Sequence, residues 1–168
     1  YNIMQVTKRN GKLQDVSFLE NLIPKLKIIN AKKEKSKPIL IKISPDLNQN
    51  QLHETINLVK EHNIDGIIAT NTTTSRENLN THASKINEIG QGGLSGLPLK
   101  SKSTEVIRFI ARATNNKVPI IGVGGIMSPE DALEKIEAGA TLVQIYTGFI
   151  YSGPLLVKKI NRLILFKN

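Results

Sequence analysis

Residues 119–148 read PIIGVGGIMSPEDALEKIEAGATLVQIYTG, and this stretch decides the fold class of the chain. It begins with an apolar run, turns through two glycines and carries a helix signal that starts at Ser128-Pro129. Ser is preferred just before a helix, Pro is favoured at its first position, and Gly139 is typical just after its end. A second apolar run follows at 141–145. The stretch therefore predicts a strand, a helix and a second strand, which form a βαβ unit of a parallel sheet.

The same alternation extends through the rest of the chain. Two more apolar, strand-like runs lie at 39–43 and 66–69, and Leu52, Ile56 and Val59 recur with helical spacing between them. Further helices are expected at 15–30, 101–114 and 154–165, and a polar, glycine-rich loop is expected from 70 to about 98. Strands that are apolar on both faces are typical of a parallel sheet covered by helices, as in a doubly wound sheet or a TIM barrel.

The positions of the polar residues favour the barrel. Lys42, Thr70-Asn71, Gly124-Gly125 and Tyr146-Thr147 all lie at the carboxyl ends of predicted strands. TIM barrels carry their chemistry at that end and commonly bind phosphate in the loops after their last two strands. We predict an α/β fold: the C-terminal portion of a TIM (β/α)₈ barrel, with about four βα units.

The length of the chain agrees with a partial barrel. A complete barrel typically needs about 250 residues, so we expect these 168 residues to be a piece of a longer protein. We divide the chain into a poorly patterned segment at 1–36, with one helix, and the barrel portion at 37–168.

The composition excludes several classes of protein. The chain has a formal net charge of +9 and no cysteine, which rules out a disulfide scaffold, a thiolate metal site and a cysteine nucleophile. Its basic residues are scattered, apart from the run at 32–37, whereas nucleic-acid-binding proteins concentrate charge in a patch. We therefore predict no nucleic-acid partner. No apolar run approaches the roughly 20 residues of a membrane span.

Two glycine- and hydroxyl-containing loops follow the last two predicted strands. Gly124-Gly125 is compatible with an ordinary tight turn or with a phosphate-binding loop. Tyr146-Thr147 occupies the equivalent place in the next unit, so backbone N–H groups and a hydroxyl converge on one region. We predict that these loops bind a phosphate group.

Lys42 and Asn71 are the other candidate ligand-binding residues. Lys42 interrupts an apolar strand, either as a snorkelling or salt-bridged lysine or as a cation directed into the barrel mouth. We favour the second interpretation, because burying a charge without a function is costly. Asn71 lies either in a polar turn or at a site for amide and carboxylate groups, since its side chain both donates and accepts.

The remaining titratable residues predict no further chemistry. His53, His62 and His82 have no second ligand at metal-binding spacing, so we predict no metal site. Asp46 and Glu130 stand at turn and cap positions, which do not require a catalytic role. The sequence contains neither a paired-carboxylate pattern nor a Ser-His-Asp pattern.

Several motifs in a fixed order resemble those of the dihydroorotate dehydrogenase family, specifically its quinone-dependent, membrane-associated class. They are Lys42–Leu47 (KISPDL), Asn63–Gly66 (NIDG), Ala69–Thr73 (ATNTT), Gly92–Leu99 (GGLSGLPL), Ile121–Ile126 (IGVGGI), Ala138–Ala140 (AGA) and Val143–Gly148 (VQIYTG). The resemblance covers about residues 37 to 165. It implies an FMN-dependent TIM barrel that oxidises dihydroorotate to orotate in pyrimidine biosynthesis and passes electrons to a quinone.

The resemblance also implies roles for individual residues. Those implied to bind FMN are Lys42, Thr70, Gly96, Gly124, Gly125, Tyr146 and Thr147, with Lys42 beside the flavin ring and the last three at the phosphate. Asn71 and Thr72 are implied to bind dihydroorotate or orotate. The general base of this class is a serine on a lid loop with an Asn-x-Ser-x-Pro-Asn motif, which these residues lack. We therefore expect no catalytic residue within this chain, and little turnover by it alone.

The implied location is peripheral, on a bacterial or mitochondrial inner membrane. N-terminal helices outside these residues would contact the membrane and the quinone, whereas the 168-residue chain would be soluble and able to self-associate.

Two alternative functions stay open. One is another FMN-dependent TIM-barrel oxidoreductase, which reduces pyrimidine bases or oxidises a hydroxy acid. The other is a non-catalytic half-barrel that only binds phosphate.

Overall fold

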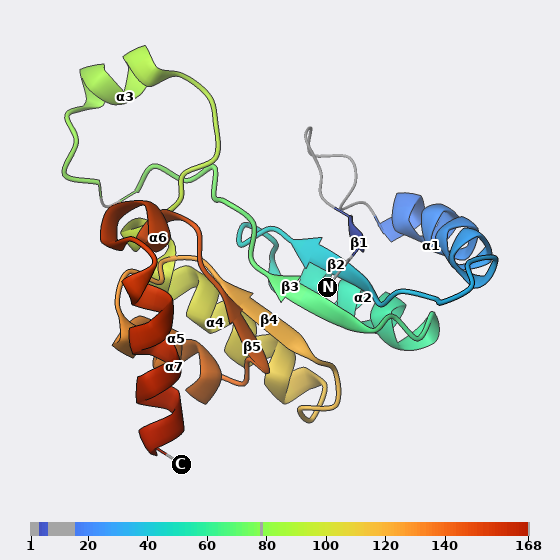
Figure 1. Ribbon diagram of the computed structural model, residues 1–168. Coiled ribbons are helices and arrows are strands. Elements are labelled where there is room, and N and C mark those ends of the chain that lie inside the picture. The colour runs from blue at the N-terminus through green and yellow to red at the C-terminus, as the bar shows by residue number, and fades with distance from the viewer. Residues whose placement is uncertain (1–3, 7–15, 78, 168) are drawn as a thin grey trace.

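The computed structural model describes residues 4–6, 16–77 and 79–167 (Figure 1). The described strands are β1 (Met4–Val6), β2 (Ile39–Ile43), β3 (Gly66–Ala69), β4 (Ile120–Val123) and β5 (Leu142–Gln144). The described helices are α1 (Val16–Ala31), α2 (Gln49–Glu61), α3 (Ala83–Ile89), the 3₁₀ helix η2 (Leu97–Leu99), α4 (Lys100–Ala113), α5 (Pro129–Glu137), α6 (Thr147–Ser152) and α7 (Leu155–Lys167). Strands and helices alternate, as the α/β prediction requires.

The strand order distinguishes between the two architectures that the sequence allowed. The strands lie in the order β1-β2-β3-β4-β5, and every neighbouring pair is parallel. A doubly wound sheet reverses its strand order in the middle, whereas a barrel adds each strand beside the preceding one. The sheet is therefore a segment of a TIM barrel, and the prediction of a partial barrel is confirmed.

The two faces of the sheet have different surroundings. Helices α1, α2 and α4 cover one face, and the larger hydrophobic core between them and the sheet includes Ile23, Ile56 and Ile107. Right-handed crossovers place successive helices on this one side. On the opposite face, a smaller cluster contains Leu40, Ile68 and Val123. This second face corresponds to the interior of the barrel.

The ends of α5 follow the sequence signals. Ser128 Oγ accepts a hydrogen bond from the Asp131 N–H, and the Asp131 side chain accepts one from the Ser128 N–H, so the pair forms a capping box. Pro129 occupies the first turn, and Gly139 follows the helix with a φ of 112°. These contacts fix the direction in which the chain leaves the Gly124-Gly125 loop.

The N-terminal region joins the same sheet. Met4 pairs with Ile39, so β1 adds a strand to the four that the sequence predicted. Helix α1 confirms the predicted helix and continues through Pro24. Proline has no N–H to donate to the carbonyl four residues earlier, at Glu20. Both residues are exposed, so water can satisfy that carbonyl.

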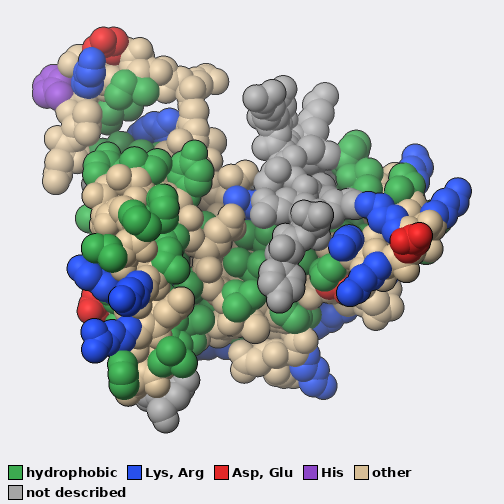
Figure 2. Space-filling view, in the orientation of Figure 1, with side chains coloured by type: hydrophobic (Ala, Val, Ile, Leu, Met, Phe, Trp, Pro, Cys, Tyr) green, Lys and Arg blue, Asp and Glu red, His purple; other side chains and the backbone are tan. Residues whose placement is uncertain are grey.

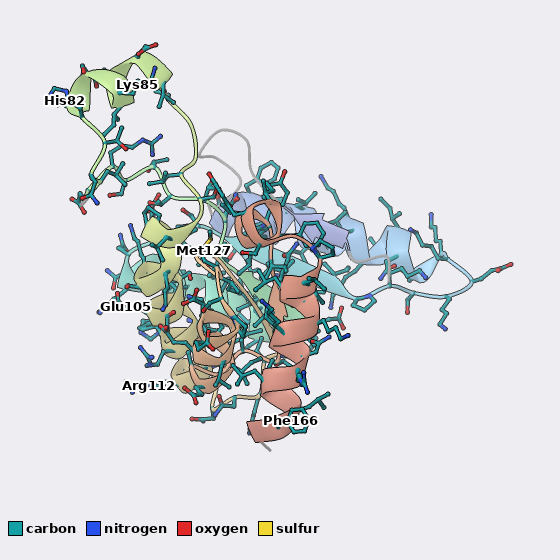
Figure 3. All side chains as sticks on the ribbon, turned by 60° about the vertical axis from the view of Figure 1, so that its left-hand side comes forward. His82, Lys85, Glu105, Arg112, Met127 and Phe166 are labelled. Atoms are coloured by element: carbon teal, nitrogen blue, oxygen red, sulfur yellow. The ribbon has the colours of Figure 1, made fainter. Side chains whose placement is uncertain are left out.

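Two short α-helices were not predicted. The stretch expected to be a loop contains α3, which has no buried residue and projects from the rest of the molecule together with His82 and Lys85 (Figures 1 and 3). Helix α6 begins where only a turn was expected, three residues after the end of β5. An apolar helical face marks helices that pack on a core, and a six- or seven-residue helix is too short to display one. None of the described helices combines the length and apolar character needed to cross a bilayer.

Candidate functional site

A pocket of about 260 Å³ lies at the carboxyl ends of β2 to β5. It is lined by all nine residues that the sequence assigned to cofactor or substrate: Lys42, Thr70, Asn71, Thr72, Gly96, Gly124, Gly125, Tyr146 and Thr147. Its wall also includes Ser95, Leu99, Val123, Ile126, Gln144, Ile145 and Gly148. The fold thus brings the predicted residues together at one place, while the role of each stays a prediction.

Lys42 lies on the pocket side of β2. Its neighbours Ile41 and Ile43 are buried in the core beneath the helices, so the alternation of a strand directs Lys42 to the opposite face. Burial lowers the pKa of its ammonium group. None of the ion pairs formed by the described residues includes Lys42. Lys42 therefore has no salt-bridge partner in the described part of the chain, and its cation is available to an anionic ligand.

The segment that follows β3 is anchored to both neighbouring strands. The Thr70 N–H donates to the Val123 carbonyl at 2.8 Å, and the Asn71 N–H donates to the Ile43 carbonyl at 2.7 Å. Asn71 Oδ1 accepts a hydrogen bond from the Thr72 N–H at 3.0 Å. The Asn71 amide N–H groups have no acceptor among the described residues, so they can donate to the oxygen of a ligand.

The Gly124-Gly125 loop requires glycine at both positions. Their φ angles are 120° and 72°, in the region that side chains disfavour. A Cβ atom on Gly125 would lie 2.3 Å from the Cα atom of Lys100, at the start of α4. Within the described structure, the Gly125 N–H donates to no backbone carbonyl. The loop is a tight turn, as one alternative predicted, and it keeps a donor for an anion, as the other requires.

The start of α6 and the loop before η2 form the adjoining wall. The Thr147 hydroxyl donates to Ser95 Oγ at 3.0 Å. A Cβ atom on Gly96, whose φ is 83°, would lie 3.1 Å from Thr147 Cγ2. The N–H groups of Tyr146 and Thr147 have no backbone acceptor in the described parts of the chain. Two loops separated by about fifty residues are therefore joined beside these free donors.

A buried polar cluster lies behind the glycine loop, and the sequence analysis missed it. The Ser103 hydroxyl donates to the Gly124 carbonyl at 2.9 Å, and Lys135 Nζ donates to Ser103 Oγ at 2.6 Å. Lys135 is fully buried and also donates to the Lys100 carbonyl and to Thr104 Oγ1. Burial lowers its pKa to about 8. No signal in the sequence distinguishes Lys135 from the other lysines.

Gln144 is a second residue that the sequence analysis missed. It lies in β5, lines the pocket, and pairs in register with Val123 on the barrel-interior face. Its Oε1 atom is buried and has no hydrogen-bond partner in the described structure. The signal that identified Lys42, a polar residue inside an apolar strand, was present here as well.

The histidines lie apart from this pocket. The His53 ring contacts Phe109 edge-on, with 4.9 Å between the ring centroids, and His82 Nδ1 lies 2.9 Å from Ser84 Oγ. In the described ranges, no three His, Asp or Glu side chains are grouped to hold a metal ion. The polar groups of the pocket are instead a cation, an amide and backbone donors, which suit an anionic organic ligand.

The chain matches known proteins over nearly its whole length. A family model described as dihydroorotate dehydrogenase matches residues 8–165, so the similarity begins well before residue 37. A dihydroorotate dehydrogenase (quinone) from Christiangramia forsetii is 54% identical over 99% of this chain and 49% of its own length. One from Nostoc punctiforme is 50% identical over 95% of this chain and 44% of its own. The chain therefore spans about half the length of these curated relatives.

Solved structures agree with these sequence matches. The ligand-free dihydroorotate dehydrogenase from Eimeria tenella superposes with a TM-score of 0.85 at 30% identity, covering 95% of this chain and 49% of that one. The same enzyme in complex with ferulenol gives a TM-score of 0.83. The barrel-type strand order, the pocket at the strand ends and the family match agree, and the chain belongs to the dihydroorotate dehydrogenase family.

Proposed function

We propose that the full-length protein containing this chain oxidises dihydroorotate to orotate in pyrimidine biosynthesis, with FMN as cofactor and a quinone as electron acceptor. One observation carries the proposal: the Lys42 cation, an amide side chain and two loops whose N–H groups have no backbone acceptor in the described structure meet in one pocket. The printed names of the relatives support the choice of reaction. Because the chain spans about half of their length, the activity is proposed for the full-length protein.

The residues of the pocket fit a phosphorylated flavin. The N–H groups of Gly125, Tyr146 and Thr147 have no backbone acceptor in the described structure, and we assign them to the phosphate group. Lys42 supplies a cation in the same pocket, and it has no ion-pair partner among the described residues. Gln144 Oε1 is a buried acceptor without a partner in the described ranges, which is rare in a protein interior unless a ligand or another segment satisfies it. When bound, FMN supplies the acceptor for the hydride that leaves C6 of dihydroorotate.

Lys42 and Asn71 perform distinct tasks in this proposal. The half-buried ammonium of Lys42 stabilises negative charge that develops beside it, and this effect is stronger away from bulk water. The amide N–H groups of Asn71 bind oxygen atoms of the substrate and orient it, together with Thr72. Neither residue accepts a proton in this scheme.

Other tasks are assigned to parts of the full-length protein outside these residues. Removal of the C5 proton requires a base, and the serine lid motif of the quinone-dependent class does not occur in residues 1–168. A positioned base contributes a rate factor of roughly 10²–10⁴. We also assign the quinone site and peripheral membrane contact to those other parts.

Purified full-length protein tests the proposal directly. We expect a bound flavin and dihydroorotate-dependent reduction of a soluble quinone with formation of orotate. A colourless protein with an intact fold would favour the phosphate-binding half-barrel. A flavoprotein that reduces pyrimidine bases or oxidises a hydroxy acid, but does not form orotate, would favour the other FMN-dependent barrel.

Two glycine-to-alanine variants test the assignment of the phosphate-binding loop separately. Gly125→Ala forces a Cβ atom against Lys100 and should lower the flavin content of the purified protein. Gly92→Ala is the matched control, because a Cβ atom there has no neighbour within 4 Å. Equal flavin content in the two variants would contradict the assignment of this loop.

A further inference from the structure

Asp46 connects three elements next to the pocket, although the sequence analysis assigned it only to a turn. It follows β2 in the segment Ser44-Pro45-Asp46 and does not itself line the pocket. Its carboxylate accepts four hydrogen bonds, from donors on the segment after β3 and on α4. Both carboxylate oxygen atoms of Asp46 are therefore engaged by other segments of the chain.

Both oxygen atoms of Asp46 bind the segment that follows Asn71-Thr72. Oδ1 accepts from the Thr73 hydroxyl at 2.6 Å, and Oδ2 accepts from the Thr74 N–H at 2.8 Å and the Thr74 hydroxyl at 3.0 Å. The two threonines are the next residues in the chain after the proposed substrate-binding pair. Their position therefore limits the positions open to Asn71 and Thr72.

Thr73 also connects the segment after β3 to the part of the pocket wall that contains Ser95 and Gly96. It is buried, and it forms an antiparallel bridge with Leu94, with N–H to carbonyl distances of 3.1 and 2.7 Å. Leu94 directly precedes Ser95 and Gly96, which line the pocket. Asp46 thus binds Thr73. Thr73 is joined to the proposed substrate-binding segment along the chain and to the Ser95-Gly96 wall through its bridge with Leu94.

Lys102 completes the arrangement from α4. Its Nζ atom lies 2.6 Å from Asp46 Oδ1. Hydrogen bonds between charged groups are shorter and stronger than neutral ones, so the carboxylate is held from two directions. The ends of β2 and β3 and the first turn of α4 are therefore fixed relative to one another.

We propose that Asp46 is a positioning residue for substrate binding, which holds Asn71 and Thr72 in place through Thr73 and Thr74. The inference rests on the proposed function, because it concerns the substrate-binding segment of that site. It does not involve contact between Asp46 and the substrate.

A matched pair of carboxylates tests the proposal in the flavin-loaded full-length protein. Asp46 joins β2 and β3 at the end where the pocket lies. Asp65 joins the same two strands at the other end, where its Oδ2 accepts from the Ile39 N–H at 2.7 Å. In Asp46→Asn one acceptor oxygen becomes an NH₂ group. This group cannot accept a hydrogen bond from the donors that surround Asp46. Asp65→Asn makes the same chemical change far from the pocket.

Orotate binding, followed by the change in the flavin spectrum, is the main measurement. For Asp46→Asn we expect the Kd for orotate and the KM for dihydroorotate to rise by about tenfold or more, because small displacements of positioning groups have large effects. Flavin content and the pH profile of kcat should stay at wild-type values. Asp65→Asn should bind orotate like the wild type. Thr74→Val, an exposed change that removes one bond to Asp46, should give a smaller rise in the same direction.

The outcomes separate the two proposals. Wild-type orotate affinity in both Asp46→Asn and Thr74→Val would overturn the positioning role. Equal losses in Asp46→Asn and Asp65→Asn would also overturn it, because they would indicate general destabilisation. If the wild-type protein itself bound flavin but neither orotate nor dihydroorotate, the proposed function would be the part in error.

Discussion

Lys135 Nζ lies 2.6 Å from Ser103 Oγ, and that hydroxyl donates to the Gly124 carbonyl at 2.9 Å. A fully buried ammonium group on α5 therefore supports the glycine loop through one serine on α4. Since Gly124 and Gly125 line the pocket, this cluster connects the stability of the helical layer with the shape of the proposed phosphate site.

Ser103→Ala should lower the free energy of unfolding. The substitution removes the donor to the Gly124 carbonyl and one of the acceptors of Lys135, both in a buried site, at a cost of about 1–3 kcal/mol. Urea denaturation of the full-length protein measures this change. Ser36→Ala, at an exposed loop position, is the control and should leave the denaturation midpoint unchanged. Equal midpoints for both variants would contradict a supporting role of Ser103.

Lys42→Ala should slow flavin reduction more than it weakens flavin binding. A cation beside the ring acts mainly on the state in which negative charge has developed, so its effect is differential. Removing one such group commonly lowers the rate by about 10²-fold. Rapid mixing of the flavin-loaded full-length protein with dihydroorotate gives the rate, and flavin absorbance gives the occupancy. An unchanged rate of reduction would exclude the role assigned to Lys42.

Asn71→Ala should raise the KM for dihydroorotate and leave the flavin content unchanged. The variant deprives polar groups of the substrate of their partner, which costs about 1–3 kcal/mol, and each 1.4 kcal/mol or so of that loss lowers the affinity about tenfold. Steady-state kinetics and flavin absorbance on the same preparation check both parts. Loss of flavin from this variant would make Asn71 a cofactor residue instead.

Because of Asp46, the free energy of unfolding should depend on pH in the acid range. Burial alone would raise the pKa of its carboxyl, but hydrogen bonds from Lys102, Thr73 and Thr74 outweigh burial and lower the pKa from 3.8 to about 2. A carboxyl with a lowered pKa in the folded state stabilises the protein above its unfolded-state value and loses that contribution as pH falls through its folded-state value. The stabilisation should therefore be complete above about pH 5 and be lost below about pH 2.

Comparison of wild type with Asp46→Asn isolates this contribution. The difference between their free energies of unfolding in urea should be constant from pH 7 to about pH 5 and should shrink toward pH 2. A difference that stays constant over the whole range would show that Asp46 has an ordinary pKa.

The isolated 168-residue chain should self-associate. Helices α6 and α7 expose Ile150, Tyr151, Leu155 and Phe166, and Figure 2 shows hydrophobic side chains gathered over this region. Leu142, on the edge strand β5, is 60% exposed. Open strand edges and large apolar patches promote association. Sedimentation at micromolar concentration should show dimers or larger species, and Leu142→Lys should reduce them. A stable monomer would contradict this prediction.

Much of the local structure could be predicted from residues close together in the chain. Strands β2 to β5 and helices α1, α2, α4, α5 and α7 coincide with the runs and periodicities expected for them. The start of α5 at Ser128-Pro129 follows from capping chemistry, which involves only a few consecutive residues. Lys42 and Asn71 were found because polar residues at the ends of apolar strands contrast with their neighbours. The short helices α3 and α6 lack such a signal, and the sequence did not predict them.

By itself, then, the sequence determined the class of fold, the order of the elements and nine of the residues that line the pocket, because these depend on local patterns and on resemblance to a family. Only the tertiary structure decided that the strands are added in sequence without reversal, which places Lys42 and Tyr146 in one pocket. It also decided the roles of Asp46 and Lys135, whose partners lie from 27 to 56 residues away along the chain. Hydrogen bonds between distant segments, and the burial of side chains between them, depend on tertiary packing. Such packing produces no periodic pattern in the sequence.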